Sequence, residues 1–287
     1  MSMTSINWYP GHMKKTKDMI LENLKIIDIV LEIVDARVPL SSKNPDIEKI
    51  TKNKHRILLL NKSDLVTKSE IDYWREYFIK NNLADEVLDI SAETGQNIKK
   101  LYEIMNKFLN KKKEKMLKRG ILNTTAKILI AGIPNVGKSK LINILVGKKA
   151  TGVGDRPGFT KGKQWVRIKS NYELLDTPGI LWPKFESEQV GINLAIVGSI
   201  KDDILDIEYI TNEFINYLRK SNKLSVIRER YKIEESIDEF SNSEIIDRVS
   251  IKMGNIQKGG ILRTEQTAYA ILKDYRDSRL GKFGVEK

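Results

Sequence analysis

Short apolar runs alternate with helical patterns in the chain before residue 185. The apolar runs are rich in branched side chains, and they predict buried parallel strands at residues 29–34, 56–60, 87–90 and 126–131. Apolar positions spaced for one helical face predict helices at residues 70–81, 97–108 and 138–145. A strand pair turned at residues 170–171 is expected over 164–175. The alternation predicts an α/β fold, a doubly wound and mostly parallel sheet that binds ligands at the carboxyl ends of its strands.

The pattern changes after residue 185, where strand-like runs give way to helical periodicity. We therefore expect two domains, an α/β domain over residues 1–185 and an all-helical domain over residues 186–287. A loop at residues 254–260 is expected to join two helices of the second domain. The chain has no internal repeat, and the lysine-rich run 111–119 is the segment most like a linker.

Composition excludes several classes of protein. Hydrophobic residues make up 40% of the 287, which is typical of a globular chain. The sequence has no cysteine, so disulfides, thiolate metal sites and cysteine nucleophiles are excluded. The first residues lack the layout of a signal peptide, and the most apolar stretch, 26–34, contains Asp28 and Glu32. We expect a cytoplasmic protein that does not enter a membrane.

Positive charge is both large and clustered. The formal net charge is +12, with cations gathered at residues 14–17, 111–119, 161–169 and 276–282. A lysine-rich composition alone would spread its charge over the surface. Clusters of this kind favour a polyanionic partner, and nucleic acid is the expected one.

Residues 132–139 match the phosphate-binding pattern GxxxxGK[ST], between a predicted strand and a predicted helix. Glycines at both ends let backbone amides turn toward a β-phosphate, while Lys138 supplies charge to the phosphates and Ser139 a hydroxyl to Mg²⁺. The residues of this loop expected to bind nucleotide are Asn135, Val136, Gly137, Lys138, Ser139 and Lys140. Lys140 itself is expected to face outward.

The tetrapeptide Asp-Thr-Pro-Gly at residues 176–179 follows the phosphate loop. Taken alone it could be a simple turn. Behind a phosphate loop, Asp176 can hold Mg²⁺ through water and the Gly179 amide can reach a γ-phosphate. Thr160 lies between the two motifs in a glycine-rich segment, and it is either an ordinary loop residue or the switch threonine that completes Mg²⁺ coordination.

The tetrapeptide Asn61, Lys62, Ser63 and Asp64 stands at the end of the strand predicted over 56–60. The Asp64 carboxylate can accept two hydrogen bonds from guanine, whereas adenine offers no such pair of donors. Asn61 and the stem of Lys62 would support the base and the loop. Ser91 and Ala92, after the next strand, resemble a second guanine-contact turn whose backbone amide reads the base oxygen.

The guanine-reading residues precede the phosphate loop, which reverses the order of an ordinary GTPase. Together with residues 8–13 (Trp-Tyr-Pro-Gly-His-Met), 35–39 (Asp-Ala-Arg-Val-Pro), 157–160 and Ile180, this order resembles the circularly permuted GTPases of the ribosome biogenesis GTPase A family. The resemblance covers nearly the whole chain. It implies a GTPase that uses GTP, GDP and Mg²⁺, acts late in assembly of the large ribosomal subunit or its precursor, binds rRNA and leaves after hydrolysis. The helical domain would then contact RNA or the ribosome, and we expect a monomer.

Small GTPases orient the attacking water with a glutamine after the Asp-x-x-Gly turn, but residues 180–182 here are Ile-Leu-Trp. Two residues could replace this glutamine. The resemblance implies that His12 enters the site on the ribosomal particle, although it could instead contact RNA phosphate or cap a helix. Asn135 could hold K⁺ between the phosphates, or it could simply tolerate the turn.

Other functions remain open at this point. A permuted GTPase could act on the small subunit or as an RNA-bound regulator away from ribosomes. A GTP-gated RNA-binding scaffold with negligible turnover is also compatible with the missing glutamine. A P-loop kinase would leave residues 61–64 without a function.

Overall fold

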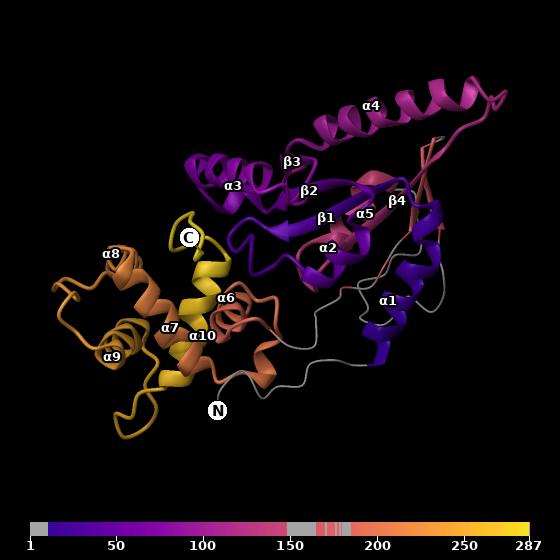
Figure 1. Cartoon of the computed structure of the whole chain (residues 1–287). Coiled ribbons are helices and arrows are strands. Elements are labelled where there is room, and N and C mark those ends of the chain that lie inside the picture. Colours follow the sequence, from indigo (N-terminus) through magenta and orange to yellow (C-terminus); the bar gives the residue numbers. More distant parts are fainter. Residues whose placement is uncertain are drawn as a thin grey trace. The chain divides into compact units, whose positions relative to one another are not determined.

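The computed structural model describes residues 11–147, 165–169, 171–175, 177, 179 and 185–286, with only the backbone for residues 11–14. The chain divides into two compact units between residues 184 and 185. The helices and strands are labelled in Figure 1.

A six-stranded sheet forms the centre of the first unit in the described part of the chain (Figure 1). Its strand order is β3-β2-β1-β4-β6-β5, and only β5 runs antiparallel to its neighbour. The strands are β1 (Ile29–Asp35), β2 (His55–Asn61), β3 (Glu86–Asp89), β4 (Ala126–Gly132), β5 (Trp165–Ile168) and β6 (Tyr172–Leu175). The predicted mostly parallel sheet and the predicted pair β5–β6 are both confirmed.

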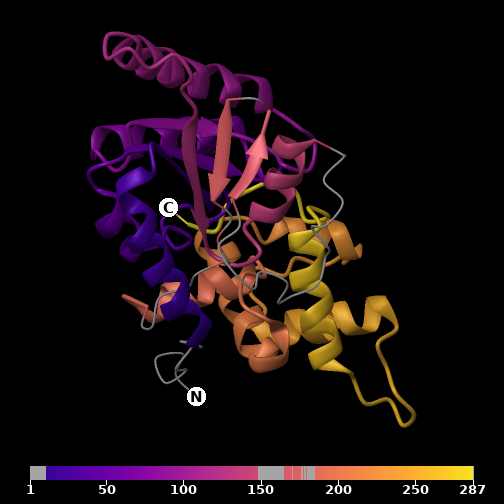
Figure 2. The same ribbon diagram turned by 90° about the vertical axis from the view of Figure 1, so that its right-hand side faces the viewer.

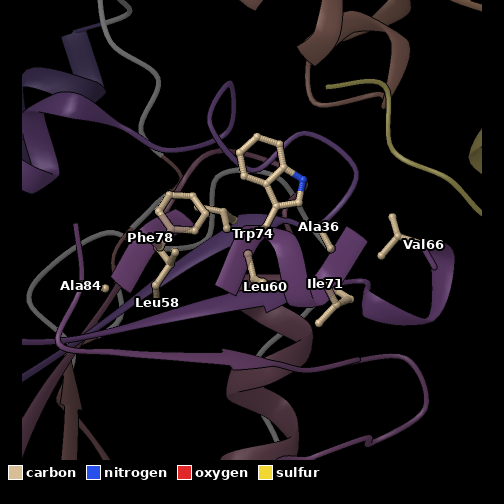
Figure 3. Close-up of a cluster of buried hydrophobic side chains, with 9 residues drawn as sticks. Ala36, Leu58, Leu60, Val66, Ile71, Trp74, Phe78 and Ala84 are labelled. Atoms are coloured by element: carbon tan, nitrogen blue, oxygen red, sulfur yellow. The ribbon is translucent and has the colours of Figure 1, made fainter. Parts of the chain in front are cut away.

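Helices cover both faces of this sheet, as the doubly wound prediction requires (Figure 2). They are α1 (Gly11–Asn23), α2 (Pro45–Thr51), α3 (Lys68–Lys80), α4 (Ile98–Leu117) and α5 (Lys138–Val146). Trp74 and Phe78 of α3 pack over Leu58 and Leu60 of β2 (Figure 3). This apolar stripe was visible in the sequence, and a capping box at Thr67 fixes where α3 begins.

Helix α4 is longer than its apolar pattern predicted. The last buried residue is Leu109, yet the helix continues to Leu117, so residues 111–117 of the lysine-rich run are helical. Long unbranched lysine side chains lose little freedom in a helix, which explains why it continues without a core face. Gly120, at φ +76°, ends the turn that follows.

The second unit is helical in its described part, as expected. It contains α6 (Glu188–Ile196), α7 (Ile207–Lys220), α8 (Ser225–Tyr231), α9 (Asn242–Met253) and α10 (Thr264–Arg276). Tyr275 packs between Phe214 and Phe283 in its core. The predicted loop between two helices joins α9 to α10 and is closed by a bridge between Ile256 and Leu262. Within the described residues, no helix has the length and apolar character that a membrane span requires.

Candidate functional site

The carboxyl ends of β1, β2 and β4 lie at one edge of the sheet because these strands are parallel neighbours. Asn61, the last residue of β2, is buried there. Its Nδ2 donates to the carbonyl of Val136 at 2.7 Å, and its Oδ1 accepts from the amide of Ala92 at 2.9 Å. One side chain therefore joins the tetrapeptide at residues 61–64, the phosphate loop and the Ser91–Ala92 turn, which the sequence predicted as parts of one site.

Gly137 makes this junction sterically possible. Its φ of +102° lies in the left-handed region, and a Cβ at this position would stand 2.3 Å from Nδ2 of Asn61. Gly132, where β4 ends, is equally confined, because a Cβ there would stand 2.6 Å from the carbonyl oxygen of Ile33. Both glycines of the phosphate-binding pattern are therefore required by close backbone approach.

The phosphate loop folds around the side chain of Lys138, the first residue of α5. The Lys138 ammonium is buried and donates to the carbonyls of Gly132 and Ile133, each at 2.9 Å. Asn135, at the tip of the loop, is exposed and adopts a left-handed φ of 57°. A turn of this kind followed by the N-terminus of α5 is a site for anions, since amides and helix dipole both favour negative charge.

Gly179 lies directly against this loop. A Cβ on Gly179 would stand 2.8 Å from both the Lys138 ammonium and Cα of Pro134. Nearby, the buried Thr177 donates its hydroxyl to the carbonyl of Ile130 on β4, at 2.7 Å. The structure thus brings the glycine predicted to sense a γ-phosphate next to the lysine predicted to bind it.

Asp64 lies in a 3₁₀ turn, Ser63–Leu65, directly after β2. Its Oδ1 is buried, and no hydrogen-bond donor of the described residues reaches it. The amide of Ser63 donates to the carbonyl of Ile90 at 3.1 Å, which holds the turn against the strand that leads to Ser91. A buried carboxylate oxygen without a partner is costly, so a ligand that donates N–H groups to it would be bound selectively.

Lys62 forms an ion pair with Asp35, for which the sequence predicted no separate role. It adopts a left-handed φ of 61°, and its ammonium lies 2.8 Å from Oδ2 of Asp35. Arg37 also binds Asp35, with its guanidinium donating to both carboxylate oxygens at 3.0 and 2.8 Å. Burial alone would raise the pKa of Asp35, but the cations of Arg37 and Lys62 outweigh it and hold that pKa well below its ordinary value. A carboxylate directly after an apolar strand was the signal that could have identified it.

The other predicted nucleotide-binding residues that the structure describes lie in the Ser91–Ala92 turn and in the first turn of α5. Ser91 is fully buried, and its hydroxyl accepts from the amide of Thr94 at 3.1 Å. Ser139 follows Lys138 in the first turn of α5 and is exposed. Lys140 is exposed as expected, and its ammonium pairs with Glu93 beside the Ser91–Ala92 turn.

The side chains of three predicted site residues are not described. Thr160 and Asp176 lie outside the described residues, and His12 lies in the first turn of α1, where only the backbone is described. The residues that the structure describes contain no cluster of three His, Cys, Asp or Glu side chains suited to a metal ion. A Mg²⁺ ion would be held by the hydroxyl of Ser139 together with Thr160 and Asp176, and these assignments stay predictions.

The profile of a family described as 50S ribosome-binding GTPase matches residues 127–249. Ribosome biogenesis GTPase A of Bacillus licheniformis is 42% identical over 282 residues, covering 98% of each chain. The protein of the same name from Thermotoga maritima is 29% identical, covering 98% of this chain and 94% of its own.

Two solved structures share the fold. A structure titled as GDP-bound TM YlqF has a TM-score of 0.64 at 24% identity, covering 94% of this chain and 98% of its own. GNP-bound YlqF from T. maritima has a TM-score of 0.63 at 25% identity, covering 95% and 98%. The likeness extends over both units of the chain.

Proposed function

Because this chain belongs to the ribosome biogenesis GTPase A family, we propose that it hydrolyses GTP as a switch during late assembly of the large ribosomal subunit. GTP hydrolysis in ribosome biogenesis is the activity of the family. The proposal adds that the protein binds rRNA of the large subunit or its precursor in the GTP state. After hydrolysis it leaves the particle, and all of this takes place in the cytoplasm.

The observation that carries the proposal is the junction at Asn61. Its two hydrogen bonds join a base-reading segment to a phosphate-binding segment, which is the geometry that one nucleotide needs. Asp64, with a buried oxygen that no described donor reaches, supports guanine over adenine, because only guanine presents paired N–H donors. The nucleotide would therefore lie along the edge formed by the ends of β2 and β4.

The residues around the phosphates support hydrolysis by positioning and charge. Lys138, held inside the loop by two carbonyls, can transfer its hydrogen bonds to β- and γ-phosphate oxygens with a small movement. Gly179, in contact with the same loop, would donate its amide to the γ-phosphate. When bound, Mg²⁺ supplies positive charge to the phosphate oxygens, and Ser139, Thr160 and Asp176 would hold it.

Water activation needs a residue other than glutamine. We assign this role to His12, delivered by α1 when the protein binds its particle, with K⁺ held by Asn135 as the second candidate. A histidine delivered on the particle would make the protein slow alone and faster on the ribosome, whereas K⁺ held by Asn135 would make the rate depend on potassium. The segment after Gly179 leads directly into the second unit, so a change at the γ-phosphate would pass along the chain to the unit proposed to contact RNA.

The decisive experiment measures multiple-turnover phosphate release from GTP, alone and with purified large or small subunits. Potassium and sodium buffers are compared in parallel. We expect stimulation by the large subunit only, and a greater rate in potassium if Asn135 holds the ion. Stimulation by the small subunit alone would instead support the alternative client, and no stimulation by either subunit would contradict the proposal.

A scaffold without turnover is the second candidate. It is favoured by one observation, the absence of a glutamine after Gly179. Such a protein would co-sediment with large subunits in the presence of GTP and release no phosphate. The same experiment therefore separates the switch from the scaffold.

A further inference from the structure

We propose that the far end of α4 is an arm that binds the phosphate backbone of double-helical RNA. The basic arm is defined as residues 110–119, which follow Leu109, the last buried residue of the helix. At about 1.5 Å per residue, its helical part, residues 110–117, extends about 12 Å past the core. Figures 1 and 2 both show this end of α4 reaching away from the sheet. The inference rests on the proposed function for RNA as a partner and assigns part of that contact to one element.

The charge of the arm is almost entirely positive. Its only anion is Glu114. Its cations are Lys111, Lys112, Lys113, Lys115, Lys118 and Arg119. Within the described part of the chain, Lys112 is the only one of these six cations whose side chain forms an ion pair or hydrogen bond. Five cations on a projecting helix are therefore available to an external anion.

The cations are ordered along the helix. Lys111, Lys115 and Lys118 are spaced by four and three residues, so they lie on one side of α4. All three side chains are exposed. Successive members are about 6 Å and about 4.5 Å apart along the axis, which suits a row of phosphates.

The arm is fixed at its base, which favours binding. The Lys112 ammonium lies 2.6 Å from Oδ2 of Asp28 and donates to the carbonyl of Thr125 at 2.8 Å. The same Asp28 oxygen accepts from the amide of Lys127 on β4, also at 2.8 Å. Because the helix is already anchored to the sheet, an incoming polyanion would not have to order it first.

Stabilisation of the helix itself does not account for this charge. Cations near a helix C-terminus interact favourably with the helix dipole, but the effect is confined to the last turn. Lys115, Lys118 and Arg119 fall within reach of that effect, whereas Lys111 and Lys113 lie a full turn or more before the end at Leu117. Mutual repulsion in an isolated arm would favour fewer cations, not more.

The composition of the arm distinguishes among polyanions. Unpaired RNA is bound chiefly by stacking on aromatic rings, and residues 110–119 contain none. A membrane surface requires a broad apolar face beside the cations, and the arm has only Met116 and Leu117. Double-helical RNA, contacted through its phosphates, is the partner that remains.

The test uses the full chain and a labelled RNA hairpin of about 20 base pairs. The arm variant is Lys111→Gln/Lys115→Gln/Lys118→Gln, and the matched control is Lys49→Gln/Lys52→Gln/Lys80→Gln. The control removes equal charge from exposed lysines of the same unit. Dissociation constants are measured by fluorescence anisotropy over a range of salt concentrations. We expect the arm variant to lose about ten-fold or more in affinity. The number of counterions released on binding, taken from the slope of log affinity against log salt concentration, should fall by about two to three.

Several outcomes would overturn the proposal. They are an equal loss in the control variant, a greater loss for an unpaired oligonucleotide than for the hairpin, or unchanged hairpin binding with reduced binding to vesicles of phosphatidylglycerol and phosphatidylcholine. As a measurement without substitutions, acetylation of Lys111, Lys115 and Lys118 in the wild-type protein should fall when the hairpin is present; unchanged acetylation would also count against the arm. Hairpin binding needs no ribosome, so it can succeed even if large subunits fail to stimulate hydrolysis.

Discussion

The ammonium of Lys62 lies 2.8 Å from the buried carboxylate of Asp35, which joins the end of β1 to the turn after β2 that is predicted to read guanine. Asp35 is also bound by Arg37, so the carboxylate holds two cations at the edge where the nucleotide is proposed to bind. Lys62 is thereby fixed at one end of the turn and Asp64 at the other. The turn that carries Asp64 is thus held by Asp35, which lies beside Asn61 at the end of the neighbouring strand β1.

Removing the charge of Asp35 should destabilise the fold. Asp35→Asn would leave the buried Arg37 without its ionised partner, and loss of one member of a buried pair typically costs about 3–5 kcal/mol. Urea unfolding at neutral pH measures this free energy. The control is Asp46→Asn, which breaks the partly exposed pair with Lys17 and should cost less than about 1 kcal/mol. Equal effects of the two substitutions would show that the buried pair has no special role.

Asp35 should also make stability depend on pH. Its pKa is lower in the folded chain than in the unfolded chain, so its stabilisation is present above the unfolded value of about 3.9. That stabilisation is lost as the pH falls below this value toward the folded pKa. The difference in unfolding free energy between wild type and Asp35→Asn should therefore be largest at pH 7 and smaller at pH 3. A difference that grows on acidification would contradict the assigned direction of the pKa.

Loss of the Asn61 side chain should weaken nucleotide binding. Asn61→Ala would leave the Val136 carbonyl and the Ala92 amide without these hydrogen bonds, and each buried unsatisfied group costs about 1–3 kcal/mol. We expect the dissociation constant for a fluorescent GTP analogue to rise by about ten-fold or more. Asn81→Ala, which removes an exposed bond to the Tyr77 carbonyl, is the control and should leave affinity unchanged.

Base selection should follow Asp64. In Asp64→Asn the new amide can donate to the extra oxygen of xanthine, so xanthosine triphosphate should compete better than GTP in a displacement assay. Asp72→Asn, on the exposed side of α3, should keep the preference for guanine. An unchanged preference in Asp64→Asn would place the base elsewhere.

Catalysis by His12 can be separated from binding. His12→Ala should keep GTP affinity near wild type and reduce hydrolysis stimulated by large subunits by about ten-fold or more, the lower range of general acid–base effects. The chain's other histidine, His55, stacks on Phe108 with ring centroids 5.3 Å apart, which makes His55→Ala a suitable control. Equal stimulated rates in wild type and His12→Ala would remove this residue from the mechanism.

Local patterns were sufficient to predict the sheet and the segments that meet at its edge. Strand runs, a glycine-lysine loop and the tetrapeptide at 61–64 each have short-range signatures, and parallel strands must end together. The end of α4 was missed because its prediction relied on apolar spacing, which stops at Leu109 while the helix continues. The bond between Asp35 and Lys62 was missed because it joins two strands, and no local pattern states which side chains will face each other.

Asn61 and Val136, joined by one hydrogen bond, are 75 positions apart. Translation therefore delivers β1 and β2, with the turn predicted to read the base, well before β4 is complete. A nascent chain of that length lacks the loop predicted to bind the triphosphate. Bound nucleotide would therefore stabilise the domain only after β4 has paired with β1. It would favour only those chains in which this pairing is complete.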